Sequence, residues 1–179
     1  DLGANTGIFS RIASKKAIPT LSLDIYPAAV EKNYIECRKH GETNILPLLL
    51  DLTNPSPSIG WANEERASLV ERGPADMVFA LALIHHLAIS NNLPFDKIAS
   101  FLSKICRFLV IEFVPKNDSQ VQRLLRSRED IFTDYDQEHF ESALSNYFLI
   151  LDYIKIEHSE RTLYLMEKQN LNNSKAIKQ

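Results

Sequence analysis

A glycine-rich turn occupies residues 1–7, which read Asp1-Leu2-Gly3-Ala4-Asn5-Thr6-Gly7. A strand that ends in such a turn and leads into a helix lets the main chain approach a ligand closely. A dinucleotide-binding turn has glycine at its first, third and sixth positions. Here Gly3 is followed by Asn5 and Ile8 at the third and sixth positions. Asn tolerates a left-handed backbone well. The turn therefore indicates either a ligand-binding loop outside the dinucleotide class or an ordinary strand-to-helix turn.

Acidic residues follow the next two apolar strands. Asp24 ends the run Leu21-Ser22-Leu23, about 20 residues beyond the turn, and Asp51 follows Leu48-Leu49-Leu50. A carboxylate at the end of the second strand can accept hydrogen bonds from both ribose hydroxyls of a nucleoside. Each Asp taken alone is more often a helix cap or loop residue. Together with Asp1, they place acids at three successive strand ends, the edge where open α/β sheets bind ligands.

Two adjacent histidines, His85 and His86, follow the fourth apolar strand. An imidazole has an ordinary pKa of about 6.5, which suits removal of a proton from a hydroxyl or amine near neutral pH. The structural alternative is that one ring packs in the turn while the other is solvated. No further ligands at metal-binding spacing surround the pair, so we expect no metal site.

Glu112 and Lys116 lie at the end of the fifth strand, on the same side of the expected sheet. We expect Glu112 to pair with Arg107 or Lys116, with contact to a substrate as the alternative.

The composition indicates one domain with a substantial core. The chain has 179 residues, 45% of them hydrophobic, and a net charge of -3. An excess of Lys and Arg, which binding to a polyanion requires, is missing, so a nucleic-acid partner is not favoured. No apolar run approaches the about 18 residues that a membrane span needs. Cys37 and Cys106 stand far apart, and we expect reduced, buried thiols in a cytoplasmic protein.

The order of apolar runs and helical segments predicts βαβ units and a parallel sheet. Leu2 is expected to be the last residue of a strand that begins before residue 1, because the chain lacks an initiator Met and opens inside a motif. The further expected strands are Thr20–Ile25, Asn44–Leu50, Ala75–Leu81, Phe108–Val114, Tyr147–Glu157 and Arg161–Glu167, the last two antiparallel. The expected helices are Gly7–Lys15, Pro27–His40, Asn63–Arg72, Phe95–Cys106, Ser119–Arg128 and Gln137–Leu144. Residues 1–168 form the expected domain, and residues 169–179 an expected frayed tail.

On these motifs the chain resembles the class I S-adenosylmethionine-dependent methyltransferases over essentially its whole length. The usual turn of that family, acidic-x-Gly-x-Gly-x-Gly, is matched at Asp1, Gly3 and Gly7, and Asn5 is the one departure. The stretches 111–116 and 126–132 also resemble bacterial methyltransferases, some of them nodulation-related, without settling a substrate.

The resemblance implies a Rossmann-like, three-layer α/β fold with a mostly parallel seven-stranded sheet, an antiparallel last strand and a truncated N-terminal strand. It implies S-adenosylmethionine as cofactor, with Asp24 at the ribose and Asp51 near the adenine amino group. It also implies that His85 and His86 face the departing methyl group. The full set of expected cofactor-binding residues is Asp1, Gly3, Asn5, Gly7, Asp24, Ile25, Asp51, Leu52 and Leu81.

Two other functions remain open from the sequence. The first is a nicotinamide-dependent oxidoreductase, which the broken glycine pattern disfavours. The second is a regulatory module that binds the cofactor without catalysis. For a methyltransferase, a small-molecule or carbohydrate-like acceptor is favoured over protein or RNA, and the oligomeric state is not indicated.

Overall fold

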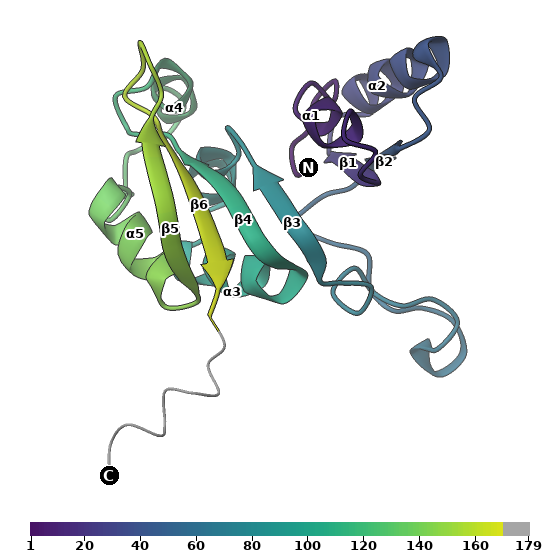
Figure 1. The fold of residues 1–179 in the computed structure, drawn as a ribbon. Helices are drawn as coiled ribbons and strands as arrows, with labels where there is room; N and C mark the ends of the chain where they lie inside the picture. Colours follow the sequence, from purple (N-terminus) through teal and green to yellow (C-terminus); the bar gives the residue numbers. More distant parts are fainter. Residues whose placement is uncertain (170–179) are drawn as a thin grey trace. The chain divides into compact units, whose positions relative to one another are not determined.

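The computed structural model describes residues 1–169, which divide into two compact units (Figure 1). The N-terminal unit comprises Asp1–Arg72 and Phe79–Leu83. The C-terminal unit comprises Gly73–Val78 and the described residues from Ile84 onward. The expected tail lies outside the described residues, except for Gln169.

Parallel strands organise the N-terminal unit. β1 (Thr20–Asp24) pairs with β2 (Ile45–Leu49), with Asp24 opposite Leu49. Leu2 forms a parallel bridge with Leu23 and donates its N–H to the Phe79 carbonyl at 2.8 Å. Leu2 therefore lies between β1 and the last residues of β3. The glycine turn, Asp24 and Asp51 all follow carboxyl ends of chain segments that run in parallel.

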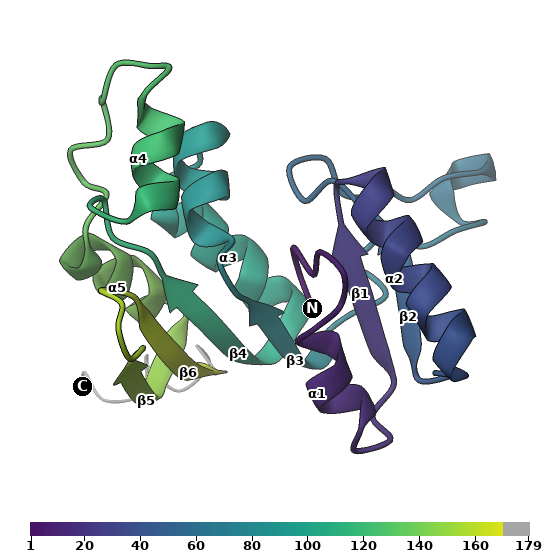
Figure 2. The ribbon, with the colours of Figure 1, turned by 90° about the horizontal axis from the view of Figure 1, so that it is seen from above.

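Two helices cover one face of this parallel pair (Figure 2). α1 spans Ser10–Ser14 and α2 spans Pro27–His40. Ser10 Oγ and Asn33 Nδ2 both hydrogen-bond to Ser22 Oγ, at 2.9 and 2.8 Å, so both helices face the same side of β1.

Local chemistry sets the two ends of α2. Pro27 begins the helix, where its fixed φ fits and its missing N–H costs nothing. Gly41 ends it in the left-handed region, at φ 64°. Basic residues in the last turn, Arg38, Lys39 and His40, complement the negative end of the helix dipole. The sequence prediction for this helix is confirmed.

The C-terminal unit contains a four-stranded sheet in the order β3-β4-β6-β5. β6 is antiparallel to both of its neighbours, as predicted for the closing strands. Figure 2 shows α3 and α5 on one face of this sheet. The strands are β3 (Ala75–Ala80), β4 (Cys106–Phe113), β5 (Phe148–Lys155) and β6 (Thr162–Lys168). The helices are a π-helical turn (His86–Ser90), α3 (Phe95–Ile105), α4 (Ser119–Leu125) and α5 (Gln137–Ser145).

Aromatic rings fill the core of the C-terminal unit. Phe140 is fully buried, and its ring centroid lies 5.1 Å from that of Phe113, 5.4 Å from Tyr164 and 5.6 Å from Phe95. These rings come from two helices and two strands, so one cluster joins the helical layer to the sheet.

Two fold predictions are wrong. Within residues 1–169 there are six strands in two sheets, and the expected first strand is reduced to the bridge at Leu2, so the continuous seven-stranded sheet is not observed. The helix expected at 63–72 is also absent, and only a 3₁₀ turn at Trp61–Asn63 forms there. Ala62 and Asn63 have φ of 54° and 61°, and the Arg66 N–H bonds to the Ile59 carbonyl. The segment lacks the apolar stripe that would hold a helix against a core.

The prediction of one domain over residues 1–168 stays a prediction, as does the three-layer arrangement. Cys37 and Cys106 are free and buried, as expected. In the part of the chain that the structure describes, no helix has the length and apolar character of a membrane span.

Replacing Phe140 by Ala tests the aromatic core. We expect Phe140→Ala to lower the free energy of unfolding of the C-terminal unit by about 3–5 kcal/mol, because it leaves a cavity among three rings. Urea titration followed by tyrosine fluorescence, to which the buried Tyr135 and Tyr164 of this unit contribute, measures this change. Leu149 is 57% exposed, and Leu149→Ala should stay within about 0.5 kcal/mol of the wild type. Equal, small effects of the two substitutions would contradict this description of the core.

Candidate cofactor and catalytic site

Three residues of the glycine turn have a left-handed backbone: Gly3 at φ 69°, Asn5 at 51° and Gly7 at 77°. Asn5 thus adopts the left-handed backbone that Asn tolerates well. A Cβ on Gly3 would lie 3.2 Å from Leu83 Cδ1, and a Cβ on Gly7 would lie 2.4 Å from Asn33 Oδ1. Packing and backbone conformation therefore both select glycine at these two positions.

Asp24 ties the turn to the end of β1. Its Oδ2 accepts the Asn5 N–H at 2.7 Å, and its Oδ1 accepts the Tyr26 N–H at 2.8 Å. A carboxylate offers about four acceptor positions, so two remain for a ligand. The two main-chain donors fix the orientation of the carboxylate before any ligand arrives, and they give Asp24 a structural role as well.

Asp51 lies beside Asp24 at the same sheet edge, because the Leu50 N–H donates to the Asp24 carbonyl at 2.9 Å. Its Oδ1 accepts the N–H and the hydroxyl of Thr53, at 2.8 and 2.7 Å. These hydrogen bonds lower the pKa of the Asp51 carboxyl, which stays ionised near neutral pH.

Apolar side chains accompany the two acids. Ile25, directly after Asp24, is 51% exposed, while Leu52 and Leu81 are half-buried. An exposed aliphatic side chain next to a fixed carboxylate suits an adenosine, which presents an apolar base face beside ribose hydroxyls. The carboxylate acceptors and apolar side chains at this edge therefore fit the predicted cofactor.

Asp1 lies inside a polar network that the sequence did not reveal. Its Oδ2 accepts the Ser10 hydroxyl at 2.6 Å, and Ser10 is linked through Ser22 to Asn33. Ser10, Ser22 and Asn33 are at most 2% exposed. The network connects the start of the turn to α1, β1 and α2. Polar residues in otherwise apolar, buried positions are the sequence signal that could have found it.

His85 and His86 belong to the C-terminal unit and differ in their exposure to solvent. His85 is 1% exposed, and its Nδ1 has no hydrogen-bond partner among the described residues. Burial, followed by the positive charges of His86 and Arg161, lowers the pKa of His85 to about 4. His86 is exposed, and its ring centroid lies 4.3 Å from that of His85.

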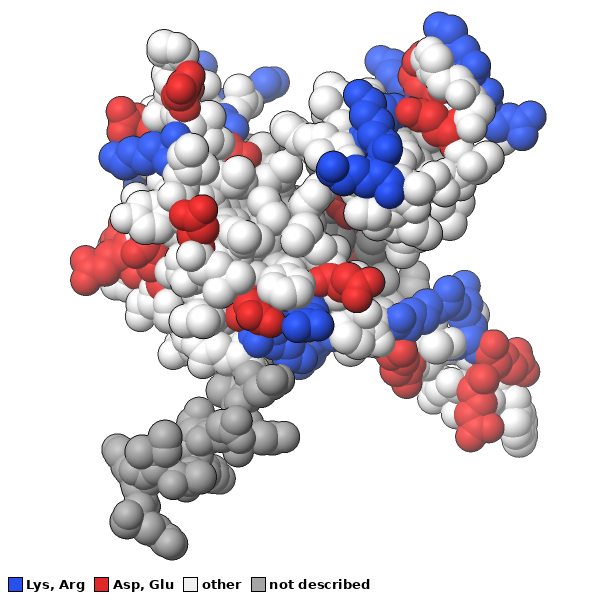
Figure 3. Space-filling view, viewed as in Figure 1, with Lys and Arg blue, Asp and Glu red and all other residues white. Residues whose placement is uncertain are grey.

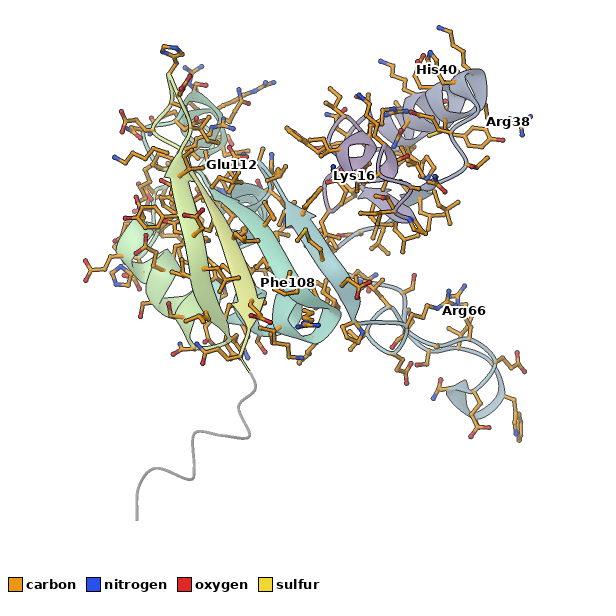
Figure 4. All side chains as sticks on the ribbon, in the orientation of Figure 1. Lys16, Arg38, His40, Arg66, Phe108 and Glu112 are labelled. Atoms are coloured by element: carbon orange, nitrogen blue, oxygen red, sulfur yellow. The ribbon has the colours of Figure 1, made fainter. Side chains whose placement is uncertain are left out.

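Glu112, near one end of β4 (Figure 4), pairs with Arg161. Its Oε1 accepts from Arg161 Nη1 at 2.9 Å, and the same guanidinium binds Asp118 at 2.7 and 3.1 Å. The expected pairing with Arg107 or Lys116 is wrong. Those two side chains bind Glu167 and Asp130 instead.

The described residues contain no group of three or more His, Cys, Asp or Glu that could hold a metal ion.

Comparisons with known proteins identify a protein of similar sequence and solved structures of similar fold. No family model matches the sequence. The chain is similar to the nodulation protein NoeA of Rhizobium meliloti (strain 1021), with 43% identity over 169 residues. This match covers 94% of the chain, and the chain spans 35% of the length of NoeA.

Solved structures of other proteins have a fold similar to that of this chain. A S-adenosylmethionine-dependent methyltransferase from Clostridium acetobutylicum matches with a TM-score of 0.62 and 15% identity, over 94% of this chain and 82% of that one. A second, from Aquifex aeolicus, matches with a TM-score of 0.58 and 13% identity, over 93% and 80%. The chain has the fold of the S-adenosylmethionine-dependent methyltransferases. At these identities, the likeness to this methyltransferase fold concerns architecture and carries no residue roles.

The steric fit at Gly7 can be tested against Gly41. Both glycines are left-handed, so an added Cβ costs about 1–2 kcal/mol in backbone strain at either position. At Gly41 no atom lies within 4 Å of that Cβ, whereas at Gly7 it meets the buried Asn33 side chain. We expect Gly7→Ala to lower the free energy of unfolding by at least about 1 kcal/mol more than Gly41→Ala. Equal losses in urea titrations would contradict the packing of Gly7 on Asn33.

Proposed function

We propose that this chain binds S-adenosylmethionine at the carboxyl edge of the strands in the N-terminal unit and transfers its methyl group to an acceptor. The observation that carries the proposal is the meeting of the left-handed turn, Asp24 and Asp51 at one edge of parallel strands. The methyltransferase fold supports it, because open α/β sheets bind ligands at this edge.

Each predicted cofactor residue has a role in this proposal. Asp24 accepts the ribose hydroxyls with the acceptor positions that Asn5 and Tyr26 leave available. Asp51 accepts from the adenine amino group, with Ile25, Leu52 and Leu81 against the base. The main chain at Gly3, Asn5 and Gly7 approaches the methionine portion of the cofactor. Asp1 holds the start of the turn in place through its hydrogen bond from Ser10.

The bound cofactor supplies an activated methyl group on a sulfonium. The protein then needs chiefly to align the acceptor, since proximity and orientation contribute up to about 7–11 kcal/mol in favourable cases. We assign deprotonation of the acceptor to His86 rather than His85. A buried imidazole with a lowered pKa is a weak base and is closed to an acceptor, whereas His86 is exposed.

We propose a small-molecule or carbohydrate-like acceptor. The C-terminal unit contains a cavity of about 390 Å³, a volume in the range of small-molecule sites, whose lining includes Phe95, Tyr135 and Asp134. None of the predicted cofactor residues lines it. Positive and negative side chains are interspersed on the visible face of each unit (Figure 3), which gives no support for a polyanionic acceptor. The name of the relative NoeA connects that protein with nodulation.

Two free thiols, Cys37 and Cys106, support the proposed cytoplasmic location, where thiols stay reduced.

Substitution of Asp24 tests the cofactor site. We expect Asp24→Ala to lose binding of S-adenosylhomocysteine, because the ribose acceptor and the anchor of Asn5 disappear together. Calorimetry measures the affinity, and circular dichroism checks that the fold is retained. NAD should give no thermal shift with the wild type, whereas S-adenosylhomocysteine should. An unchanged affinity in Asp24→Ala would contradict the ribose assignment, and a shift with NAD alone would favour the oxidoreductase.

Separate substitution of the two histidines tests the base. We expect His86→Gln to slow methyl transfer about 100-fold without weakening S-adenosylhomocysteine binding, because proton transfer and cofactor binding use different groups. His85→Gln should keep most of the rate and lower stability. The measurement is transfer of a labelled methyl group from S-adenosylmethionine to components of a cell extract. Unchanged rates in both variants would reduce the pair to a structural role, and an absence of transfer by the wild type would favour the non-catalytic module.

A further inference from the structure

The guanidinium of Arg11, on α1, binds the glycine turn and an acid at the far end of α2. Nη1 donates to the carbonyl oxygens of Thr6 and Gly7, at 2.8 and 3.0 Å. Nε lies 3.0 and 2.9 Å from the two carboxylate oxygens of Glu42, and Nη2 lies 2.7 Å from the second oxygen. One planar side chain therefore connects residues that are distant in sequence.

The geometry of the pair requires arginine. Its donors form a rigid fork that meets two carbonyls on one side and a carboxylate on the other. A lysine ammonium is a single point of charge on a flexible stem and cannot reach both partners in the same way. The sequence showed only an Arg in a short helix and a Glu after a helix end, 31 residues apart.

The pair is partly shielded from water. The side chains of Arg11 and Glu42 are 20% and 23% exposed. Burial alone would raise the pKa of the Glu42 carboxyl, but the hydrogen bonds and the charge of Arg11 outweigh it and hold the pKa below its ordinary value. Glu42 is therefore ionised near neutral pH and keeps the guanidinium in one orientation.

The first half of the turn is held by main-chain bonds to Leu23 and Phe79, whereas its last residues, Thr6 and Gly7, lead into a short helix. α1 has five residues, and a helix of that length is not stable by itself. The turn holds Asn5 at a positive φ, and the Asn5 N–H orients Asp24. Thr6 is bonded directly to Asn5, so the main chain that Arg11 holds at Thr6 and Gly7 leads through Asn5 to the Asp24 carboxylate.

We propose that Arg11 and Glu42 are positioning residues that hold the glycine turn in the conformation that binds the cofactor. This inference rests on the proposed function. In this proposal Arg11 acts on the turn through the carbonyl oxygens of Thr6 and Gly7, Glu42 acts through Arg11, and neither residue contacts the cofactor.

Calorimetry with S-adenosylhomocysteine tests the pair on the wild-type chain and on Arg11→Gln, Arg11→Lys, Glu42→Gln and the double variant Arg11→Gln/Glu42→Gln. Arg38→Gln is the matched control, because Arg38 is exposed and its side chain points outward from α2 (Figure 4). Asp24→Ala reports on the proposed function itself.

We expect Arg11→Gln to weaken S-adenosylhomocysteine binding about tenfold, the size of one lost hydrogen bond of a charged group. Arg11→Lys should not restore the affinity, and Glu42→Gln should have a smaller effect. The double variant should bind no more weakly than Arg11→Gln, because residues that act through one another have non-additive effects. Arg38→Gln should bind like the wild type.

Amide hydrogen exchange separates positioning from general stability. In Arg11→Gln, exchange at Asn5 should accelerate more than exchange at Leu23, whose N–H bonds to the Asp1 carbonyl in the strand ladder. A merely structural role for Arg11 would accelerate both amides together.

The outcomes distinguish the two proposals. If the wild type and Asp24→Ala bind S-adenosylhomocysteine equally, or neither binds it, the proposed function is wrong and this inference falls with it. If Asp24→Ala loses binding while Arg11→Gln keeps the wild-type affinity, or if Arg11→Lys restores it in full, only the positioning role of the pair is overturned.

Discussion

The hydrogen bond from the Asn5 N–H to the Asp24 carboxylate joins the glycine turn to the end of β1, and the candidate site depends on it. Asn5 makes this bond with its backbone at φ 51°, and Gly3 and Gly7, two residues before and after it, are left-handed as well. The parallel ladder brings the partners within reach, because Leu23 exchanges main-chain hydrogen bonds with Asp1 and Ala4. Turn conformation, strand register and carboxylate orientation are therefore one linked constraint.

Local patterns were enough to predict the elements that carry this constraint. The apolar run ending at Asp24 predicted β1 to within one residue, and Pro27 and Gly41 mark the ends of α2 as expected from their backbone preferences. The positions of Asp24 and Asp51 at one edge also followed from the sequence, because parallel strands separated by helices present their carboxyl ends on the same side. Each of these inferences used residues close together in the chain.

The features that could not be predicted are contacts between residues that lie far apart in the sequence. The ion pair of Arg161 with Glu112 joins positions 49 residues apart, and spacing alone favoured nearer partners. The network through Ser10, Ser22 and Asn33 required knowledge of which helix faces lie against β1. The prediction of a helix at 63–72 was wrong because it relied on local helix-forming residues alone. Without an apolar stripe to pack against a core, these residues do not form a helix.

The most direct test of the central claim is a crystal structure of the protein with S-adenosylhomocysteine. We predict ribose hydroxyls within hydrogen-bonding distance of the Asp24 carboxylate, with Asn5 still at a positive φ and the adenine amino group near Asp51. A complex in which the ligand contacts neither aspartate, or in which Asp24 binds only the Asn5 and Tyr26 main chain, would contradict the account.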